Sequence, residues 1–475
     1  MLPTDLPRIL IAALRGGSGK TVLSVGIIAA LAKQGKTISP FKKGPDYIDA
    51  GWLALAAGRP CYNLDNFLIP EIKIIDSFLR HSQDCDIAVI EGNRGLYDGI
   101  DTIGKTSTAE LAKLLHTPVI LCLDCTKSTR TMAAIVLGCL KFDPDVPLKG
   151  VILNHVAGDR HQENIRKNIE YHCGISVLGA VPKLKKQNFP ERHMGLIPTP
   201  EHDSGFDSIS AIADTVAKHV DLHAIEQVAR EAGFLNIRDD FSMQNSRPEP
   251  LHLTMESPKI GILKDSAFQF YYPDNIEALQ DAGASVTFIS PFMDDGFPDV
   301  DALYIGGGFP ETHAEKLAEK ESFRKNLKAM AERGLPIYAE CGGLIYLGQK
   351  LILKDKSYPM AGVLPLVFGL CKKPQGHGYT LVKVEGKNPF FKVGTEFRGH
   401  EFHYSNVIEC PNGKSDMVFT MQRGSGIKDH KDGFVYKNVL ATYTHIHALG
   451  IPGWAESIVQ SAREYKKTKK TPNKN

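Results

Sequence analysis

A glycine-rich loop near the start of the chain holds the first residues that can do chemistry. Residues 15–21 read RGGSGKT and lie between an apolar run and an apolar helical pattern. Glycines let backbone amides turn toward phosphate oxygens, the helix N-terminus adds its dipole, Lys20 adds a point charge, and Thr21 is a candidate Mg²⁺ ligand. This pattern indicates nucleoside triphosphate binding. The candidate nucleotide-binding residues are Arg15, Gly16, Gly17, Ser18, Gly19, Lys20 and Thr21.

Carboxylates follow two further predicted strands. Asp46 and Asp49 lie just past one strand, Glu91 ends another, and Asp98 lies on the glycine-bounded loop after Glu91. Loops at the ends of strands in an open α/β sheet meet ligands, and a carboxylate there holds Mg²⁺ opposite a triphosphate. Glu91 is the metal candidate, and Asp98 is assigned either to a second Mg²⁺ or to the acceptor substrate. Each carboxylate taken alone is also a common capping or turn residue.

A second constellation surrounds Cys341, at the apex of a predicted strand, sharp turn and helix. Gly342 permits the tight turn, and the helix N-terminus is expected to lower the thiol pKa and to offer amides to an oxyanion. Gly307 and Gly308 end an upstream strand and are the expected source of the other oxyanion-hole donor. His445 follows a downstream strand and is the candidate base. These residues predict a cysteine nucleophile on an elbow.

Two alternations of apolar strands with helical patterns position these residues. The first covers residues 8 to about 195, with a long helix expected over 209–232, and the second begins at residue 259. Such alternation predicts parallel sheets built from βαβ units, hence an α/β fold with two doubly wound domains. The predicted parts are a phosphate-loop domain over residues 1–240, a linker over 241–257, a cysteine-elbow domain over 258–460 and a disordered basic tail over 461–475.

Composition excludes several classes of protein. The 475 residues include 56 Lys and Arg against 54 Asp and Glu, so the near-neutral chain has no overall electrostatic footprint for nucleic acid. No apolar run reaches the ~18 to 20 residues of a membrane span, and the N-terminus lacks the basic region of an export signal, which favours the cytoplasm. Cys122 and Cys125 have zinc-like spacing without a second pair, and we interpret them as buried thiols.

Nine segments in the same order resemble one family, the cobyrinate a,c-diamide synthases of corrinoid biosynthesis. That family joins a P-loop, dethiobiotin-synthetase-like domain to a class I glutamine amidotransferase domain. Its phosphate loop is of the deviant kind, which fits the leucine at position 14. The matching segments, which span nearly the whole chain, are residues 15–21, 41–49, 63–65, 91–98, 191–198, 306–311, 339–343, 399–404 and 443–445.

The resemblance implies an ATP- and glutamine-dependent amide ligase acting on a tetrapyrrole polycarboxylate, with Mg²⁺. Cys341, activated by His445, is then expected to release ammonia from glutamine, and ATP to phosphorylate a carboxylate that ammonia converts to an amide. It also assigns Asp46, Tyr47, Asp49 and Asp98 to the synthetase site as substrate-binding residues. One departure is His447, which stands where class I glutaminases commonly carry the triad glutamate, so the third member is left open.

Alternatives stay open at this point. The same chemistry on siroheme or on nickel sirohydrochlorin fits the same spacing, because all these macrocycles carry adjacent acetate side chains. A partition-type regulatory ATPase would use the phosphate loop alone, and the neutral charge and the cysteine domain count against it. An inactive glutaminase that only binds ligands is disfavoured by an intact Cys341 and His445. The assembly that we put forward is a homodimer, and we expect neither nucleic acid nor a membrane as a partner.

Overall fold

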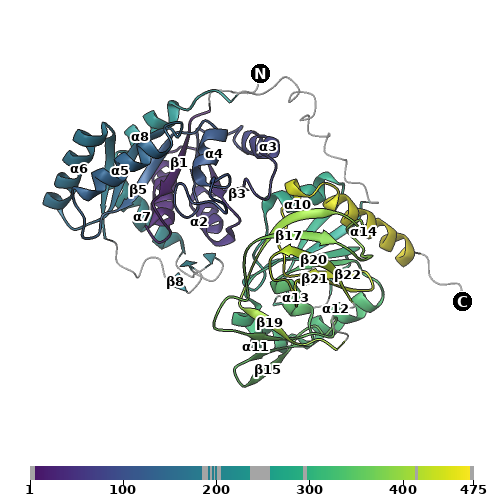
Figure 1. Ribbon diagram of the computed structural model, residues 1–475. Coiled ribbons are helices and arrows are strands. Elements are labelled where there is room, and N and C mark those ends of the chain that lie inside the picture. The colour runs from purple at the N-terminus through teal and green to yellow at the C-terminus, as the bar shows by residue number, and fades with distance from the viewer. Residues whose placement is uncertain are drawn as a thin grey trace, which may run out of the picture. The chain divides into compact units, whose positions relative to one another are not determined.

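Short apolar, β-branched runs alternate with helices in both halves of the chain, and the structure, a computed structural model, folds each half around its own sheet. The two units are Met1–Asn245 and Ser246–Asn475. Figure 1 follows them from purple to yellow along the chain. The structure describes residues 6–183, 191–192, 195–196, 198–199, 205–235, 257–292, 297–411 and 416–470.

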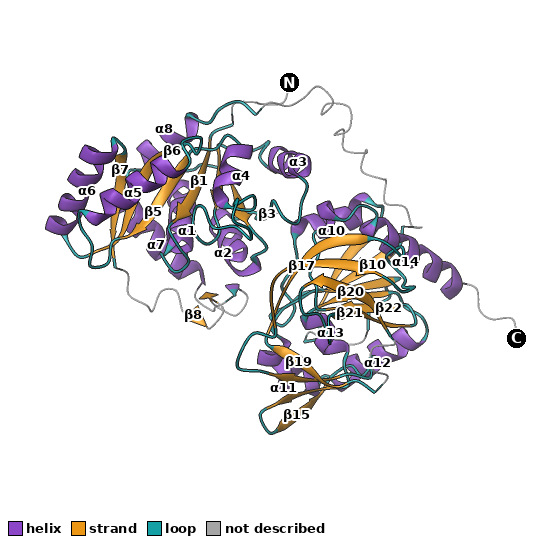
Figure 2. Cartoon of the chain, viewed as in Figure 1, coloured by secondary structure: helices purple, strands orange, loops and turns teal. Residues whose placement is uncertain are grey.

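The first unit is built on a seven-stranded parallel sheet in the order β3-β2-β4-β1-β5-β6-β7. Figure 2 shows helices on both sides of these strands, as expected for a doubly wound domain. Its elements are β1 (Arg8–Ala13), α1 (Lys20–Lys33), β2 (Ile38–Lys43), α2 (Tyr47–Ala57), β3 (Tyr62–Leu64), α3 (Glu71–His81), β4 (Ile87–Glu91), α4 (Thr108–Leu114), β5 (Val119–Asp124), α5 (Thr131–Phe142), β6 (Leu148–Val156), α6 (Asp159–Cys173), β7 (Ser176–Pro182), β8 (Glu191–Arg192), β9 (Gly195–Leu196), α7 (Gly205–His219) and α8 (Leu222–Arg230).

The second unit carries a nine-stranded sheet in the order β11-β10-β12-β13-β22-β21-β20-β17-β18, and a four-stranded sheet in the order β15-β14-β16-β19. Its elements are β10 (Lys259–Leu263), α10 (Pro273–Asp281), β11 (Ser285–Ile289), β12 (Ala302–Ile305), η2 (Pro310–His313), α11 (Ala314–Glu319), α12 (Glu321–Glu332), β13 (Ile337–Glu340), α13 (Gly342–Leu347), β14 (Lys350–Leu353), β15 (Lys356–Pro359), β16 (Val367–Leu370), β17 (Gly376–Val384), β18 (Glu396–His403), β19 (Ser405–Glu409), β20 (Met417–Arg423), β21 (Lys431–Tyr436), β22 (Val439–Thr442), η3 (Ala448–Gly450) and α14 (Trp454–Lys470).

Alternation along the central strands explains how both faces of each sheet are buried. In β1, Ile9, Ile11 and Ala13 belong to the core cluster that also contains apolar residues of α1, α2, α7 and α8. In β12, Leu303 and Ile305 join one core cluster of the second unit, while Tyr304 joins the other. Because successive strand residues point to opposite faces, these sheets have two packed faces. The prediction of an α/β fold is confirmed, and the antiparallel strands β21, β20, β17 and β18 add to it.

Two local predictions were wrong. The single helix expected over 209–232 is two helices, α7 and α8, because Val220 pairs with Gly179 and Asp221 then caps α8 by accepting a hydrogen bond from the Ala224 amide. The disordered tail expected from residue 461 is instead helical as far as Lys470, since Ile458 and Val459 bury α14 against the sheet.

Some expectations fall on residues that the structure does not describe. Of the linker expected over 241–257, residues 241–256 lie outside the described ranges, as do residues 193, 194 and 197 of the segment 191–198. Cys122 and Cys125 are buried, as predicted. Within the described ranges, no helix is long and apolar enough to cross a membrane.

Candidate active site

The phosphate loop connects β1 to α1, as the sequence predicts. Gly17 and Gly19 have φ of 75° and 79°, a left-handed conformation that favours glycine. A side chain at position 19 would also collide with the amide of Asn154, which donates a hydrogen bond to the Ser18 carbonyl at 2.9 Å. The first turn of α1 carries no acidic residue, so its N-terminal dipole has no carboxylate of its own to offset it. The loop is therefore shaped and polarised for an anion.

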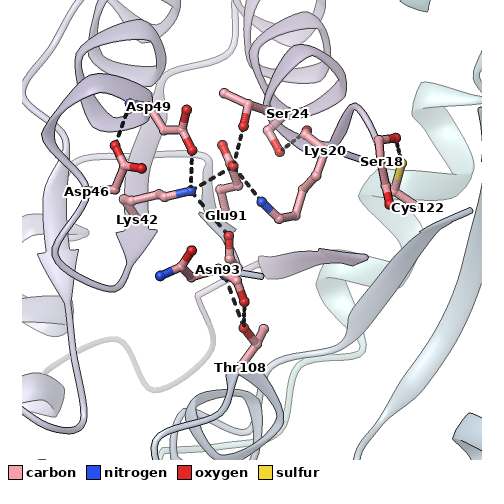
Figure 3. Close-up of polar contacts among 12 residues, drawn as sticks. Ser18, Lys20, Ser24, Lys42, Asp46, Asp49, Glu91, Asn93, Thr108 and Cys122 are labelled. Carbon is pink, nitrogen blue, oxygen red and sulfur yellow. Dashed lines mark hydrogen bonds and ion pairs between the residues drawn. The ribbon is translucent and has the colours of Figure 1, made fainter. Parts of the chain in front are cut away.

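A buried carboxylate, Glu91, faces this loop from the end of β4. The register of β1 with β4 pairs Ile11 with Glu91, which places the carboxylate beside the start of the loop. Glu91 Oε1 accepts hydrogen bonds from Lys20 Nζ at 2.9 Å and from Lys42 Nζ at 2.8 Å (Figure 3). It also accepts one from Thr21 Oγ1 at 2.8 Å. Glu91 Oε2 is buried too, yet it accepts no hydrogen bond from the described residues. That leaves one carboxylate oxygen uncompensated, a state that costs free energy unless a ligand fills it.

Thr21 and Glu91 fit the predicted Mg²⁺ site. Mg²⁺ in nucleotide sites uses one or two protein oxygens together with waters and substrate phosphates, so an orphaned carboxylate oxygen beside a hydroxyl is a suitable donor set. Within the described residues, no group of three or more His, Cys, Asp and Glu side chains could hold a metal ion. The protein would therefore supply few ligands, and the nucleotide the rest.

Lys42 links Glu91 to the acidic start of α2. Lys42 Nζ lies 2.8 Å from Asp49 Oδ2, and Asp46 caps α2 by accepting a hydrogen bond from the Asp49 amide at 2.9 Å (Figure 3). Burial acts to lower the pKa of Lys42, but the charges of Asp49, Glu91 and Asp46 outweigh it, so its pKa is raised and the ammonium is stabilised. Burial would raise the pKa of Asp49, but Lys42, Lys20 and Thr21 together lower it.

Asp46 behaves differently from its neighbour. Burial and the nearby Asp49 charge raise the pKa of Asp46 to about 6, although Lys42 opposes them. The structure thus brings Asp46 and Asp49 together with Glu91 and Lys42 in one polar cluster, and Tyr47 begins α2 next to Asp46. Lys42 lies in the segment 41–49 that carries part of the resemblance, and the register of β2 with β4, which pairs Lys42 with Glu91, brings it to that carboxylate.

Two candidates lie at the edges of this cluster. Arg15 has a largely exposed side chain whose guanidinium is 3.4 Å from Asp124 Oδ2. Asp98 is exposed, and its Oδ2 accepts a hydrogen bond from the Gly95 amide at 2.8 Å, which closes a turn. Asp98 therefore already makes the turn contact typical of an aspartate in a glycine-bounded loop.

Cys341 occupies a strained elbow between β13 and α13. Its φ of 46° and ψ of −96° are sparsely populated for a residue with a side chain, and such a conformation costs about 1 to 3 kcal/mol. Its amide donates a hydrogen bond to the Thr442 carbonyl of the neighbouring strand at 2.7 Å. The predicted nucleophile elbow is thus present in the structure, and the strain presents the sulfur at the end of the strand.

The surroundings of the Cys341 thiol disfavour its thiolate form. Burial raises the pKa of Cys341, the Glu311 and Glu340 charges raise it further, and the Gly342 amide opposes them only in part. The Gly342 amide at the helix N-terminus does lower the thiol pKa, as expected, but α13 has only six residues and the buried, acidic surroundings outweigh it, so the net pKa is raised. Formation of the thiolate needs a base.

The glycine loop after β12 lies against the elbow. A Cβ at Gly342 would come 3.0 Å from the Gly308 amide nitrogen, and a Cβ at Gly307 would come 2.5 Å from His445 Cε1. At Gly308 any side chain would collide with the Ala267 carbonyl. Gly307 and Gly308 therefore have no room for a side chain. The loop that they form lies against the elbow and the imidazole of His445, which is a suitable position for oxyanion-hole donors.

His445 follows β22, which pairs in parallel with β13 so that Glu340 lies beside Thr442. Its Nδ1 is 3.2 Å from Glu340 Oε2, and its ring stacks on His400 at a centroid distance of 4.9 Å. Glu340 has no exposed surface and was not singled out from the sequence. His447 lies elsewhere, with Nε2 3.4 Å from Asp274 Oδ2.

A second buried carboxylate shapes the chain before His445. Asp432 of β21 accepts hydrogen bonds from the hydroxyl of Thr442 at 2.6 Å, the amide of Tyr443 at 3.0 Å, and the amide and hydroxyl of Thr444 at 3.2 and 3.0 Å. These bonds fix the turn that carries His445 away from the end of β22. Asp432 is a positioning residue that the sequence reasoning also missed, because only the register of β21 with β22 reveals it.

Known proteins match both halves of this arrangement. Residues 9–197 match the CobQ/CobB/MinD/ParA nucleotide binding domain, and residues 259–452 match the CobB/CobQ-like glutamine amidotransferase domain. The chain is 40% identical to the cobyrinate a,c-diamide synthase of Magnetococcus marinus over 98% of each chain. It is also 40% identical to that of Archaeoglobus fulgidus, over 98% of this chain and 100% of the relative.

A third relative, the cobyrinate a,c-diamide synthase of Methanosarcina barkeri, is 37% identical over 98% of each chain. Each match extends through both units, so these relatives match the nucleotide-binding domain and the amidotransferase domain together. The resemblance seen in the nine sequence segments is thereby confirmed. This chain belongs to the cobyrinate a,c-diamide synthase family.

Proposed function

We propose that this protein amidates the a and c acetate carboxylates of cobyrinate in cobalamin biosynthesis, with ATP and glutamine as co-substrates and an acyl phosphate as intermediate. Its relatives carry the name of that enzyme over nearly the full chain. The observation that carries the proposal is that a single chain holds both a phosphate loop facing a buried carboxylate, Glu91, and a strained cysteine elbow directly after Glu340, which contacts His445. Each site supplies one half of an amide ligation.

The second unit would release ammonia. His445 takes the proton of the Cys341 thiol, and the sulfur attacks the side-chain amide carbon of glutamine while the glycine loop stabilises the oxyanion. The carbon–nitrogen bond then breaks, the proton goes to the leaving ammonia, and a thioester remains. Water hydrolyses the thioester to glutamate and restores the thiol. The close approach of Gly307 to the imidazole and of Gly342 to Gly308 supports these roles.

The first unit would activate the acceptor. A carboxylate oxygen of the tetrapyrrole attacks the γ-phosphorus of ATP and ADP leaves; ammonia then adds to the acyl carbon and phosphate leaves. Lys20 and the loop amides hold the triphosphate, and Lys42 holds Asp49 and Glu91 in place. Mg²⁺, bound through Thr21 and Glu91, would neutralise charge on the transferred phosphoryl group. Asp46, Tyr47, Asp49 and Asp98 remain the proposed acceptor-side residues.

Incubation of the purified chain with cobyrinic acid, sirohydrochlorin, nickel sirohydrochlorin and siroheme in separate reactions tests the substrate. Each exchange of OH for NH₂ lowers the mass by about one unit, and mass spectrometry reads it directly. We expect two exchanges on cobyrinic acid, dependent on ATP and glutamine. Exchange on siroheme or nickel sirohydrochlorin with none on cobyrinic acid would reassign the substrate and leave the chemistry in place. Fractionation of cells that express the chain tests the predicted cytoplasmic location, and sedimentation of the purified chain tests a homodimer.

A further inference from the structure

Glu340 is a fully buried carboxylate that contacts the proposed base from the strand that also carries the nucleophile. Its Oε2 lies 3.2 Å from His445 Nδ1, and its Oε1 accepts a hydrogen bond from the Ile446 amide at 3.4 Å. Both donors belong to consecutive residues, so the carboxylate holds the ring and the adjoining backbone together. From this contact we infer that Glu340 is the positioning residue that orients His445 and fixes its proton on Nδ1, in the role left open by His447.

The tautomer decides whether His445 can act as a base. With the proton on Nδ1 donated to Glu340, Nε2 carries a lone pair and can take the thiol proton. Nε2 is the nitrogen that faces the glycine loop, since a Cβ at Gly307 would lie 3.3 Å from it. After proton transfer the Glu340 carboxylate stabilises the His445 imidazolium. This stabilisation matters because the buried Cys341 thiolate is disfavoured, so the transfer needs a favourable acceptor.

His447 does not compete for this role. Its Nε2 lies 3.4 Å from Asp274 Oδ2, and its ring packs on Tyr272 at a centroid distance of 4.6 Å. A histidine and aspartate pair in this place resembles a buried structural pair. The strand pairing of β13 with β22 instead delivers the glutamate from the residue directly before the nucleophile.

Other charged and titratable groups around the imidazole come from neighbouring elements. His400 of β18 stacks on the ring, and burial together with the His445 and His447 charges lowers its pKa, so it is neutral and shares a hydrogen bond with Tyr272 at 2.7 Å. Asp432 already accepts bonds from the turn before His445. Glu340 is thus a carboxylate whose hydrogen bond reaches the ring.

The inference rests on the proposed glutaminase chemistry, and the test separates the two. Glutamine hydrolysis is first measured for the wild-type chain and for Cys341→Ala. Hydrolysis by neither would overturn the proposed function itself. Once hydrolysis by the wild-type chain is established, Glu340→Gln is compared with His447→Asn. His447 is also buried and lies two residues after His445, so its replacement is the matched control.

Glu340→Gln keeps the shape of the side chain but places its amide NH₂ against one of the two groups that donate to Glu340, His445 Nδ1 or the Ile446 amide. If that NH₂ faces Nδ1, it donates there and moves the ring proton to Nε2, which abolishes the base. We expect kcat/KM for glutamine to fall by about 10² to 10⁴-fold, the range seen when a triad carboxylate is neutralised. Alkylation of Cys341 by iodoacetamide, followed on its peptide by mass spectrometry, should need a higher pH. His447→Asn should stay within about threefold of the wild type.

Two further measurements distinguish positioning from folding. Trp454 is buried in the second unit, so its fluorescence reports whether that unit remains folded in each variant. Glu340→Asp keeps the charge, and we expect it to recover part of the activity and the wild-type alkylation pH. The proposal is overturned if Glu340→Gln stays within threefold of the wild type or if His447→Asn loses as much. It is also overturned if both Glu340 variants lose activity only in step with the Trp454 signal.

Discussion

Replacing Lys42 by methionine should destabilise the first unit far more than its size change suggests. The ammonium lies 2.8 Å from both Asp49 Oδ2 and Glu91 Oε1, and its side chain is 1% exposed. Removing one partner of a buried ion pair costs about 3 to 5 kcal/mol, because the remaining charge is left in a poorly solvated site. Glu91 keeps Lys20 at 2.9 Å, so we expect the lower end, about 3 kcal/mol. For a unit of this size that corresponds to about 6 to 12 °C in Tm.

The chain offers its own probe and control for this measurement. It has two tryptophans, Trp52 buried in α2 of the first unit and Trp454 in the second, so a Trp454→Phe background lets Trp52 fluorescence follow the first unit alone. Lys33→Met is the matched control, since Lys33 pairs with Asp214 at 2.6 Å with side chains 46% and 71% exposed. An exposed pair contributes at most about 1 kcal/mol.

The pH dependence supplies the test of mechanism. The pKa of Lys42 is raised above its unfolded value, so its contribution is complete below about pH 10. The pKa of Asp49 is lowered, so its contribution is present above about pH 4 and is lost as the pH falls through the folded pKa. The difference between wild type and Lys42→Met should therefore shrink below pH 4. The ion-pair reasoning would be refuted if Lys42→Met and Lys33→Met lowered the unfolding temperature equally. It would also be refuted if the difference between wild type and Lys42→Met did not change at low pH.

Three further predictions concern chemistry and charge. Cys341→Ala should abolish glutamine-dependent amidation while sparing synthesis from added ammonia, and loss of both activities would contradict the division of labour between the units. Lys20→Ala should lower the rate of ATP-dependent amidation by at least about 100-fold and leave glutamine hydrolysis measurable, as an ammonia-release assay would show. Asp46→Asn should raise the unfolding temperature followed by Trp52 fluorescence at pH 7.5 and leave it unchanged at pH 4. The folded unit raises the pKa of Asp46 to about 6, so ionised Asp46 destabilises the fold at any pH above its pKa in the unfolded chain. An unchanged unfolding temperature at both pH values would contradict this.

Sequence patterns predicted those features that depend on local spacing. The phosphate loop and the Cys341 elbow each occupy one strand–turn–helix segment, so glycine positions and the apolar run before them were enough. The strands that lead into these segments were predicted within a few residues for the same reason, whereas β14 to β21 were not predicted. The joint position of Asp49 and Glu91 was also predicted, because the ends of parallel strands share an edge of the sheet.

Features that depend on register between distant strands were not predictable. Glu340 and His445 are 105 residues apart, and only the pairing of β13 with β22 brings them together. The tail was mispredicted because its lysines dominate the composition, while Ile458 and Val459 decide the helix by burying one face. The net rise of the thiol pKa was not predictable either, because burial outweighs a short helix.

The place of β22 in the nine-stranded sheet has a consequence for biosynthesis of the protein. Residues 439–442 lie between β13 and β21, so the strand that is synthesised after every other strand of this sheet completes its middle. A nascent chain that ends before β22 therefore contains Cys341 but not His445. The nucleotide loop and Glu91, by contrast, have been synthesised by residue 91. A translation product cut short before residue 439 would thus keep the loop and lose the glutaminase centre altogether.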